Sequence, residues 1–149
     1  MVRLADTHIE NRELVHPNHA NNLGTAHGGN VTKWLDEVGA MSAMRFAGEQ
    51  CVTARMDQVN FRRPIQVGDA ALIEAYVYAA GETSVRVCVR ASRENPQTGE
   101  TQRTTESVLV YVAIDDDHDP VPVPDLEVET DREHRLRDAA LDAAESSDD

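Results

Sequence analysis

The sequence predicts an α+β domain in which an antiparallel sheet of about five strands wraps around one central helix. Two observations lead to this prediction. The apolar patterns follow the order strand, long helix, then four successive strands. The helix is also apolar on nearly all sides, and such a helix needs other elements around it to be buried.

The expected helix covers residues 28–47 and ends before Gly48, a residue suited to a left-handed C-terminal position. Its apolar side chains recur at helical spacing: Val31, Trp34, Leu35, Val38, Met41, Met44 and Phe46. A strip of small side chains shares a face with Asp36: Gly39, Ala40, Ala43 and Ala47. This strip would let the helix approach a strand, another helix or a slim ligand closely.

Strands are expected on both sides of the helix. The expected ranges are 8–15 before it, and 51–61, 71–79, 84–92 and 103–114 after it. Alternation is strict in the fourth of these, which places Val85, Val87 and Val89 on one face and Ser84, Arg86, Cys88 and Arg90 on the other. The segment NPQTGE at 95–100 reads as a hairpin connection that contains a glycine.

The negative charge of the chain is concentrated near its end. The 149 residues carry a formal net charge of −13, and residues 115–149 alone hold 14 acidic residues against three arginines. Prolines in DDDHDPVPVPD cannot continue a sheet. We therefore expect one sheet-and-helix domain at 1–115, followed by an acidic tail at 116–149. In that tail REHRLRDAALDAAE can form a marginal helix and ESSDD is expected to be disordered.

Composition also bounds the location and the partners. No apolar run approaches the ~20 residues that a membrane span needs, and MVRLADTHIENREL lacks a signal-peptide pattern. Cys51 and Cys88 belong to no metal or redox motif, which favours buried free thiols in a reducing compartment. We expect a soluble cytoplasmic domain. Nucleic acid is not expected as a partner, because no basic face offsets the repulsion from phosphate.

Lysine is scarce in this chain: Lys33 is the only one among 14 basic residues. Abundant acidic residues with little lysine resemble proteins from high-salt cytoplasms, which predicts a halophilic protein. A GC-rich genome that favours arginine codons, together with an acidic tail, is the alternative.

The residues that could perform chemistry lie around the start of the helix. Gly28 and Gly29 open it, and the free N–H groups and dipole of a helix N-terminus suit an oxyanion. Asp36 follows about two turns later in an otherwise apolar helix. It either faces solvent beside Glu37 or acts as a general base or nucleophile. His27 is either catalytic or a hydrogen-bonding residue of the loop.

Other site classes have no signature here. His16, His19 and His27 do not have the spacing of known metal ligands and no cysteine assists them, so no metal is expected. The GxSxG pattern of serine hydrolases and the glycine-rich nucleotide patterns are absent from the sequence. We therefore expect no cofactor.

The chain resembles the hotdog-fold acyl-CoA thioesterases, and most closely their cytosolic acyl-CoA hydrolase group. Four segments between residues 8 and 115 carry the resemblance: HPNHANNLGTAHGG, WLDEVGAMSAMR, VNFRRPIQVGD, and NPQTGE followed by VLVYVAID. The glycine pair and the aspartate indicate the superfamily, whereas the later segments favour the acyl-CoA hydrolase group.

The resemblance implies hydrolysis of acyl-CoA to a free fatty acid and CoA. The family's catalytic asparagine falls on Asn21, with Asn22 as an ambiguous neighbour, and its acid falls on Asp36. The oxyanion-binding backbone falls on His27–Gly29. It further implies a homo-oligomer, a dimer or a trimer of dimers, in which Asn21 of one subunit meets Asp36 of the other. The acyl chain would run along the buried helix.

The phosphates of CoA need positive charge from an acidic protein. The candidates are Arg62, Arg63, Arg90 and Arg93, with salt bridges on the sheet surface as the alternative. Two other functions stay open at this point. One is a dehydratase or hydratase of acyl-thioesters that uses His27 with Asp36, and the other is an acyl-CoA-binding module without activity.

Overall fold

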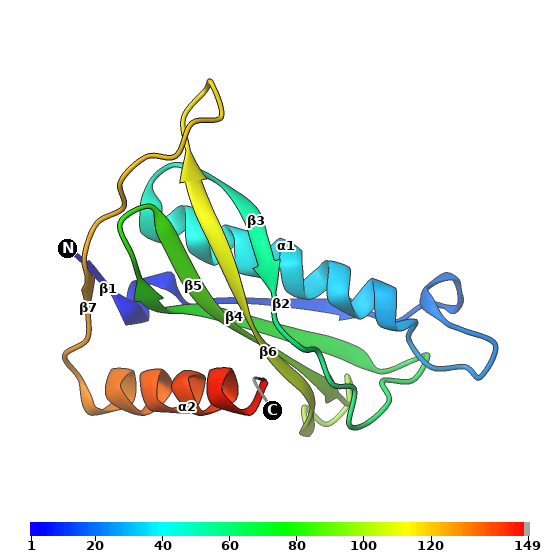
Figure 1. The fold of residues 1–149 in the computed structure, drawn as a ribbon. Coiled ribbons are helices and arrows are strands. Elements are labelled where there is room, and N and C mark those ends of the chain that lie inside the picture. Colours follow the sequence, from blue (N-terminus) through cyan, green and yellow to red (C-terminus); the bar gives the residue numbers. More distant parts are fainter. Residues whose placement is uncertain (148–149) are drawn as a thin grey trace.

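The computed structural model describes the backbone of residues 1–147. A five-stranded antiparallel sheet, in the spatial order β2-β4-β5-β6-β3, curls around helix α1 (Gly28–Ala47). The strands are β2 (Ile9–Leu14), β3 (Gln50–Met56), β4 (Ala70–Ala80), β5 (Ser84–Glu94) and β6 (Thr101–Ile114). Figure 1 shows α1 along one face of this sheet and α2 (Asp131–Ser147) on the opposite side. The predicted α+β architecture is confirmed.

Small elements complete the fold. Strand β1 (Val2–Arg3) pairs in parallel with β7 (Leu126–Glu127), and two short 3-10 helices, η1 (Leu4–Thr7) and η2 (Pro17–His19), flank β2. Within residues 1–147, none of the helices has both the length and the apolar character that a membrane crossing would require.

Helix α1 has the bounds that the sequence predicts, whereas β3 is shorter than expected. The strand ends at Met56 because the chain then leaves the regular ladder and is fixed to β6 by separate bonds. The Asp57 amide donates to the Val108 carbonyl at 3.1 Å, and the Arg62 amide donates to the Thr104 carbonyl at 3.0 Å. Residues 57–64 thus form an irregular segment held against β6.

The small-residue strip of α1 faces the sheet at its centre. A Cβ atom on Gly39 would lie 2.6 Å from the Tyr111 hydroxyl and 3.1 Å from Val89 Cγ1. Ala43 is fully buried. The strip could approach a strand, another helix or a slim ligand. The structure shows that it approaches two strands, β5 with Val89 and β6 with Tyr111.

The alternation predicted for β5 is confirmed. Val85, Val87 and Val89 are fully buried in the core between sheet and helix. Cys88 lies on the other face but is also buried, because α2 covers this part of the sheet. The Tyr76 hydroxyl on this face donates to the Leu136 carbonyl of α2 at 2.6 Å. Burial raises the pKa of the Cys88 thiol to about 11.

The acidic segment after residue 115 includes α2, which reaches Ser147 and is longer than the helix expected from sequence. Ala140 of this helix is fully buried against the outer face of the sheet. Residues 148 and 149, the end of the stretch expected to be disordered, lie outside the described residues. The division of the chain at residue 115 stays a prediction.

One buried carboxylate ties this helix to the N-terminus of the chain. The Glu133 side chain is 1% exposed and accepts hydrogen bonds from the Ala5 amide at 2.9 Å, the Thr130 amide at 3.0 Å and the Arg3 guanidinium at 3.1 Å. The Ala5 and Thr130 amides, which stabilise the ionised form, lower its pKa to about 2. The carboxylate thus joins segments that are distant in sequence.

We predict that Glu133→Gln lowers the free energy of unfolding at pH 7 by on the order of 2 kcal/mol, because a buried charge-assisted network is lost. The native carboxyl has its pKa below the ordinary value of 4.5, so its contribution is complete above pH 4.5 and is lost as the pH falls toward 2. Urea unfolding at pH 7 and pH 3 measures both effects. Glu145→Gln, exposed on the same helix, is the control. Equal stability of the two variants at pH 7 would contradict the prediction.

Candidate active site

The loop before α1 is organised by the Asn21 side chain. Its Oδ1 accepts hydrogen bonds from the Leu23 amide at 2.9 Å and the Thr25 amide at 3.3 Å, and its Nδ2 donates to Thr25 Oγ1 at 2.8 Å. Gly24 takes a positive φ of 78° where the loop turns back. One hydrogen of the Asn21 amide finds no other acceptor among the described residues and is open to a ligand. Asn22, the alternative candidate, is exposed.

His27 caps the helix. Its Nδ1 accepts a hydrogen bond from the Gly29 amide at 3.0 Å, and its carbonyl accepts those of Asn30 and Val31. The Gly28 amide has no acceptor within residues 1–147. Of the two glycines expected to bind an oxyanion, Gly28 therefore offers the open N–H, whereas the N–H of Gly29 is already used.

A pocket of about 350 Å³ brings several predicted residues together. Asn21, Gly28, Arg62 and Arg63 all contribute to it. The other lining residues are Thr25, Ala26, Val31, Phe61, Pro64, Ile65 and Thr104. The Phe61 ring lies directly against Gly28, with Cζ 3.4 Å from the place of a Cβ. The lining of the pocket thus combines apolar side chains with two arginines.

Asp36 does not line this pocket. It lies eight residues beyond Gly28, about 12 Å along the helix axis. Its Oδ1 accepts a hydrogen bond from Thr53 Oγ1 at 2.8 Å and one from the Tyr111 hydroxyl at 2.9 Å. The same hydroxyl is 2.9 Å from the Asp36 carbonyl. The carboxylate is thus partly buried and anchored to the sheet, rather than free in solvent beside Glu37.

Sequence reasoning missed Thr53 and Tyr111. They lie directly opposite each other on β3 and β6, and both point to the helix at Asp36. Neither residue type in a strand signals a site by itself. Only the pairing of two strands 58 residues apart in the chain places both hydroxyls on one carboxylate.

The four candidate arginines fall into two groups. Arg90 is 8% exposed under α2, with Nε 2.9 Å from Glu106 and its guanidinium 5.2 Å from the centre of the Tyr76 ring. Arg93 pairs with Asp69 at 3.1 Å. Both have the salt bridges that were the alternative interpretation. Arg62 and Arg63 face the pocket described above.

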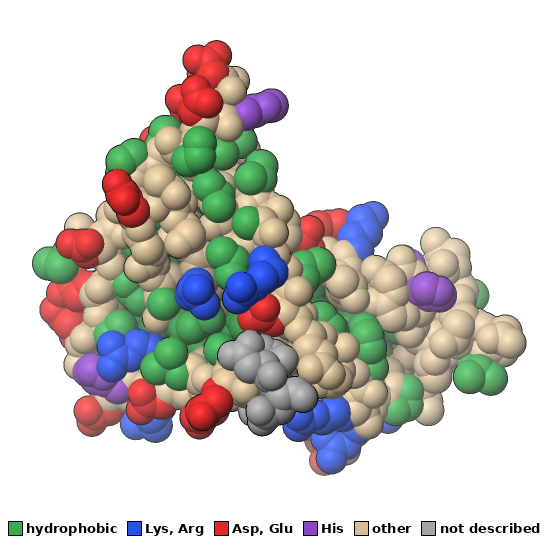
Figure 2. All heavy atoms as spheres, in the orientation of Figure 1, with side chains coloured by type: hydrophobic (Ala, Val, Ile, Leu, Met, Phe, Trp, Pro, Cys, Tyr) green, Lys and Arg blue, Asp and Glu red, His purple; other side chains and the backbone are tan. Residues whose placement is uncertain are grey.

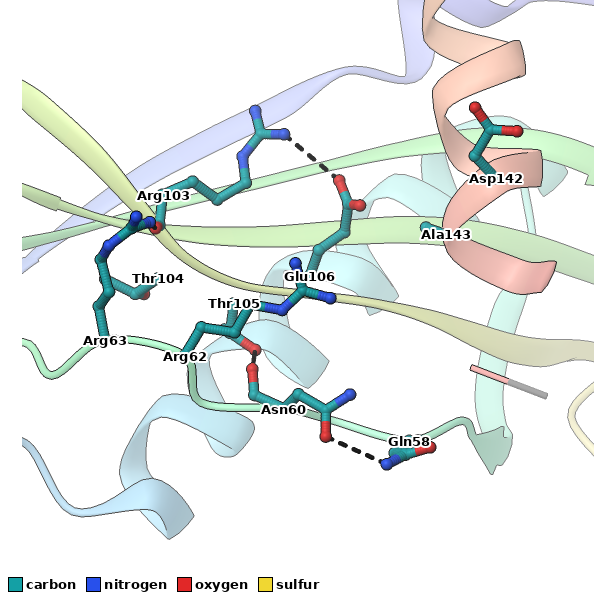
Figure 3. Close-up of a pocket in the computed structure, with 10 residues that line it drawn as sticks. All are labelled: Gln58, Asn60, Arg62, Arg63, Arg103, Thr104, Thr105, Glu106, Asp142 and Ala143. Atoms are coloured by element: carbon teal, nitrogen blue, oxygen red, sulfur yellow. Dashed lines mark hydrogen bonds and ion pairs between the residues drawn. The ribbon is translucent and has the colours of Figure 1, made fainter. Parts of the chain in front are cut away.

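Arg62 and Arg63 also line a second pocket, of about 310 Å³, together with Arg103. Figure 3 shows these arginines on one side and Asp142 of α2 on the other. Arg103 lies 3.4 Å from Glu106, and Arg63 donates to the Arg103 carbonyl at 3.1 Å. Because Arg62, Arg63 and Thr104 belong to both pockets, the two are adjacent.

His16, His19 and His27 make hydrogen bonds within the loop before α1. His19 Nδ1 accepts a hydrogen bond from the His16 amide at 3.1 Å, and its ring packs edge-on against Trp34 at 5.2 Å. The His27 amide donates to the His19 carbonyl at 2.8 Å.

Comparison with known proteins identifies the family. A sequence model described as the thioesterase superfamily matches residues 23–100. The chain is 37% identical over 130 residues to an uncharacterized acyl-CoA thioester hydrolase of Bacillus subtilis, covering 87% of this chain and 76% of that protein. This chain belongs to the thioesterase superfamily. It spans only 20% to 28% of the mammalian relatives that are 33% identical to it.

Solved structures agree over nearly the whole length. An apo-hexameric acyl-CoA thioesterase has a TM-score of 0.87 at 38% identity, with 99% of this chain and 96% of that chain covered. An acyl-CoA hydrolase of Staphylococcus aureus, solved with butyryl coenzyme A, coenzyme A and coenzyme A disulfide, has a TM-score of 0.87 at 32% identity. The match covers 97% of this chain and 88% of that one. The fold is the hotdog fold.

Three further structures of the Staphylococcus aureus enzyme each carry one alanine substitution. The replaced residues are an asparagine, an aspartate and a threonine, spaced 15 and 17 residues apart. Asn21, Asp36 and Thr53 have the same spacing in this chain.

We predict that His27→Ala destabilises the protein but preserves its chemistry. Loss of the cap leaves the Gly29 amide without its acceptor, which costs about 1 kcal/mol. Thermal unfolding should register this cost, and turnover should stay within about threefold of the parent when assayed well below the melting temperature. A loss of turnover by orders of magnitude at unchanged stability would show instead that the imidazole takes part in the reaction.

Proposed function

We propose that this protein hydrolyses the thioester of acyl-CoA to a free fatty acid and CoA. The observation that supports this most directly is the state of the Asp36 carboxylate. It is anchored through Oδ1 on the flank of a helix whose N-terminus offers the Gly28 N–H. The names of the relatives and the coenzyme A complexes among the structural neighbours support the substrate class.

The chemistry follows from the groups that are open to a ligand. The Gly28 amide would polarise the thioester carbonyl, and one such oxyanion donor is typically worth ~3 kcal/mol in the transition state. The open hydrogen of the Asn21 amide would orient the carbonyl or the attacking water. Asp36 then either activates that water as a general base or attacks the carbonyl to form an anhydride.

Two subunits would complete the site. Strand β3 pairs with β6 on one side, has no other described strand on its outer side, and exposes Val52 (47%) and Met56 (38%). Met41 of α1 is exposed as well. A two-fold axis at this edge, perpendicular to α1, would place two α1 helices antiparallel, so that the helix start of one subunit faces the middle of the other. Asn21 and Gly28 would then meet Asp36 of the partner subunit.

We propose a trimer of such dimers, which is supported by the hexameric state of two structural neighbours. The phosphates of CoA would lie toward Arg62 and Arg63, in the direction of the Arg103 pocket. Arg90 and Arg93 already pair with carboxylates, so we do not assign them to the CoA phosphates.

We also propose that the protein works in a salt-rich cytoplasm. Both cysteines are free, as a reducing compartment requires. Acidic side chains gather on the tip formed by residues 115–119, whereas the lower edge in Figure 2 carries both acidic and basic side chains. In molar KCl the Debye length falls to ~3 Å, which screens this self-repulsion.

Melting temperatures in 0.1 and 3 M KCl should therefore differ, with the higher value in 3 M.

We predict that Asp36→Asn folds but loses most activity, since an amide is neither a base nor a nucleophile. Asn21→Ala should reduce turnover by a smaller factor. Thiol release from a series of acyl-CoA substrates, from acetyl to palmitoyl, measures both. Glu37→Gln, next to Asp36 but exposed, is the control. Thiol release by Asp36→Asn at the parent rate would refute the site.

Measurements of crotonyl-CoA hydration and of acyl-CoA binding, made beside the thiol-release assay, separate the two other functions. Hydration of crotonyl-CoA without thiol release would identify a hydratase. Acyl-CoA binding without any turnover would identify a binding module.

We further predict that mixing the two impaired variants raises activity above the mean of the two. In a mixed dimer of Asn21→Ala and Asp36→Asn, one of the two shared sites keeps both residues, so that random re-association of equal amounts restores about 25% of the parental sites, in addition to the residual activity of Asn21→Ala. Light scattering before and after subunit exchange establishes that dimers are present. Activity equal to the mean of the separate variants would mean that each chain has a complete site.

A further inference from the structure

We propose that Tyr111 is a positioning residue: its hydroxyl, together with that of Thr53, pins Oδ1 of Asp36 and thereby presents Oδ2 to the reaction. This inference rests on the function proposed for Asp36. It concerns a residue that neither the resemblance nor the sequence pattern indicates.

The contacts define which oxygen is held. Both hydroxyls reach Oδ1, Thr53 at 2.8 Å and Tyr111 at 2.9 Å. Oδ2 accepts no hydrogen bond from the residues that the structure describes. A carboxylate held at one oxygen cannot turn about its own bond without breaking both contacts. The free lone pairs of Oδ2 therefore keep one direction.

The position of the Tyr111 hydroxyl is fixed by the residues around it. The Tyr111 side chain is fully buried, and its residue pairs directly with Thr53 across β3 and β6. A side chain at Gly39 would collide with the hydroxyl, because a Cβ there would lie only 2.6 Å from it. The hydroxyl also lies 2.9 Å from the Asp36 carbonyl, so it is tied to the backbone of the residue that it orients. Strand, neighbouring strand and helix thus fix this position together.

The charge states keep Tyr111 a donor. Burial, and then the bond to Asp36, raise its pKa, so the hydroxyl retains its proton. Cys51 is the other titratable group near it, and burial followed by the charge of Glu49 raises the pKa of that thiol to about 11. On α1, Lys33 and Glu37 lie 3.8 Å from each other. Tyr111 therefore stays a protonated donor to Asp36 near neutral pH.

The first test is Tyr111→Phe, which keeps the ring and removes the donor. We expect kcat to fall about tenfold with KM within twofold, because a hydrogen bond to a charged group changes an equilibrium by roughly that factor. Tyr78→Phe is the matched control. That ring is buried on the opposite face of the sheet, near Arg86. A Tyr111→Phe variant with parental kcat would overturn the proposal.

A second variant reaches the same contact from the helix. Gly39→Ala should displace the hydroxyl and lower kcat in the same way. In the Tyr111→Phe background the same substitution should have little further effect on kcat, because the hydroxyl is already gone. Full additivity of the two effects on kcat would mean that Gly39 acts through helix packing alone, and would count against the proposal.

Crystal structures of the parent, Tyr111→Phe and Tyr78→Phe separate this inference from the proposed function. The Asp36 carboxylate should lose its single orientation in Tyr111→Phe and keep it in Tyr78→Phe, whether or not the protein releases thiol. An absence of thiol release in the parent would contradict the proposed function alone. An unchanged carboxylate orientation in Tyr111→Phe would contradict the positioning role alone.

Discussion

A helix of 20 residues that is apolar on most sides needs burial from several directions, and here one curled sheet supplies most of it. The contact is closest at Gly39, where the helix backbone comes so near to β5 and β6 that no side chain fits. This close approach brings the Tyr111 hydroxyl within hydrogen-bonding distance of Asp36, which lies in the preceding turn of the helix. The position of the carboxylate is therefore a consequence of core packing, and the irregular segment at 57–64 and the loop before α1 are arranged around the same helix.

The burial supplied by one sheet is incomplete at the β3 edge. Asp36 lies at this boundary, partly buried beside β3, which exposes Val52. The open groups at the helix start, Gly28 and Asn21, are about two turns away. A second copy at the same edge would cover the apolar flank and bring the two halves of the site together. One apolar surface would thus account for both assembly and activity.

Several features of the fold could be predicted from sequence because they depend on local patterns. Helical periodicity gave the bounds of α1, and strict alternation gave the core face of β5 at Val85, Val87 and Val89. The burial of Arg90 and Glu133 could not be predicted from local patterns. It depends on α2 packing across the sheet and on the N-terminal residues Arg3 and Ala5. Thr53 escaped notice because a bulge follows it in β3, so its pairing with Tyr111 cannot be counted from the sequence. Asp36 stands out in the sequence as a carboxylate in an apolar helix, whereas Asn21 is indicated by the family resemblance alone, and the roles of both stay predictions.

The central claim is that one thioester lies between the Gly28 amide of one subunit and Asp36 of the partner subunit. A crystal structure of the full-length Asp36→Asn variant with an uncleaved acyl-CoA tests it most directly. The account predicts the thioester carbonyl within hydrogen-bonding distance of the Gly28 N–H, with the substituted side chain of the other subunit next to the carbonyl carbon. A thioester bound within a single chain, or away from both groups, would contradict it.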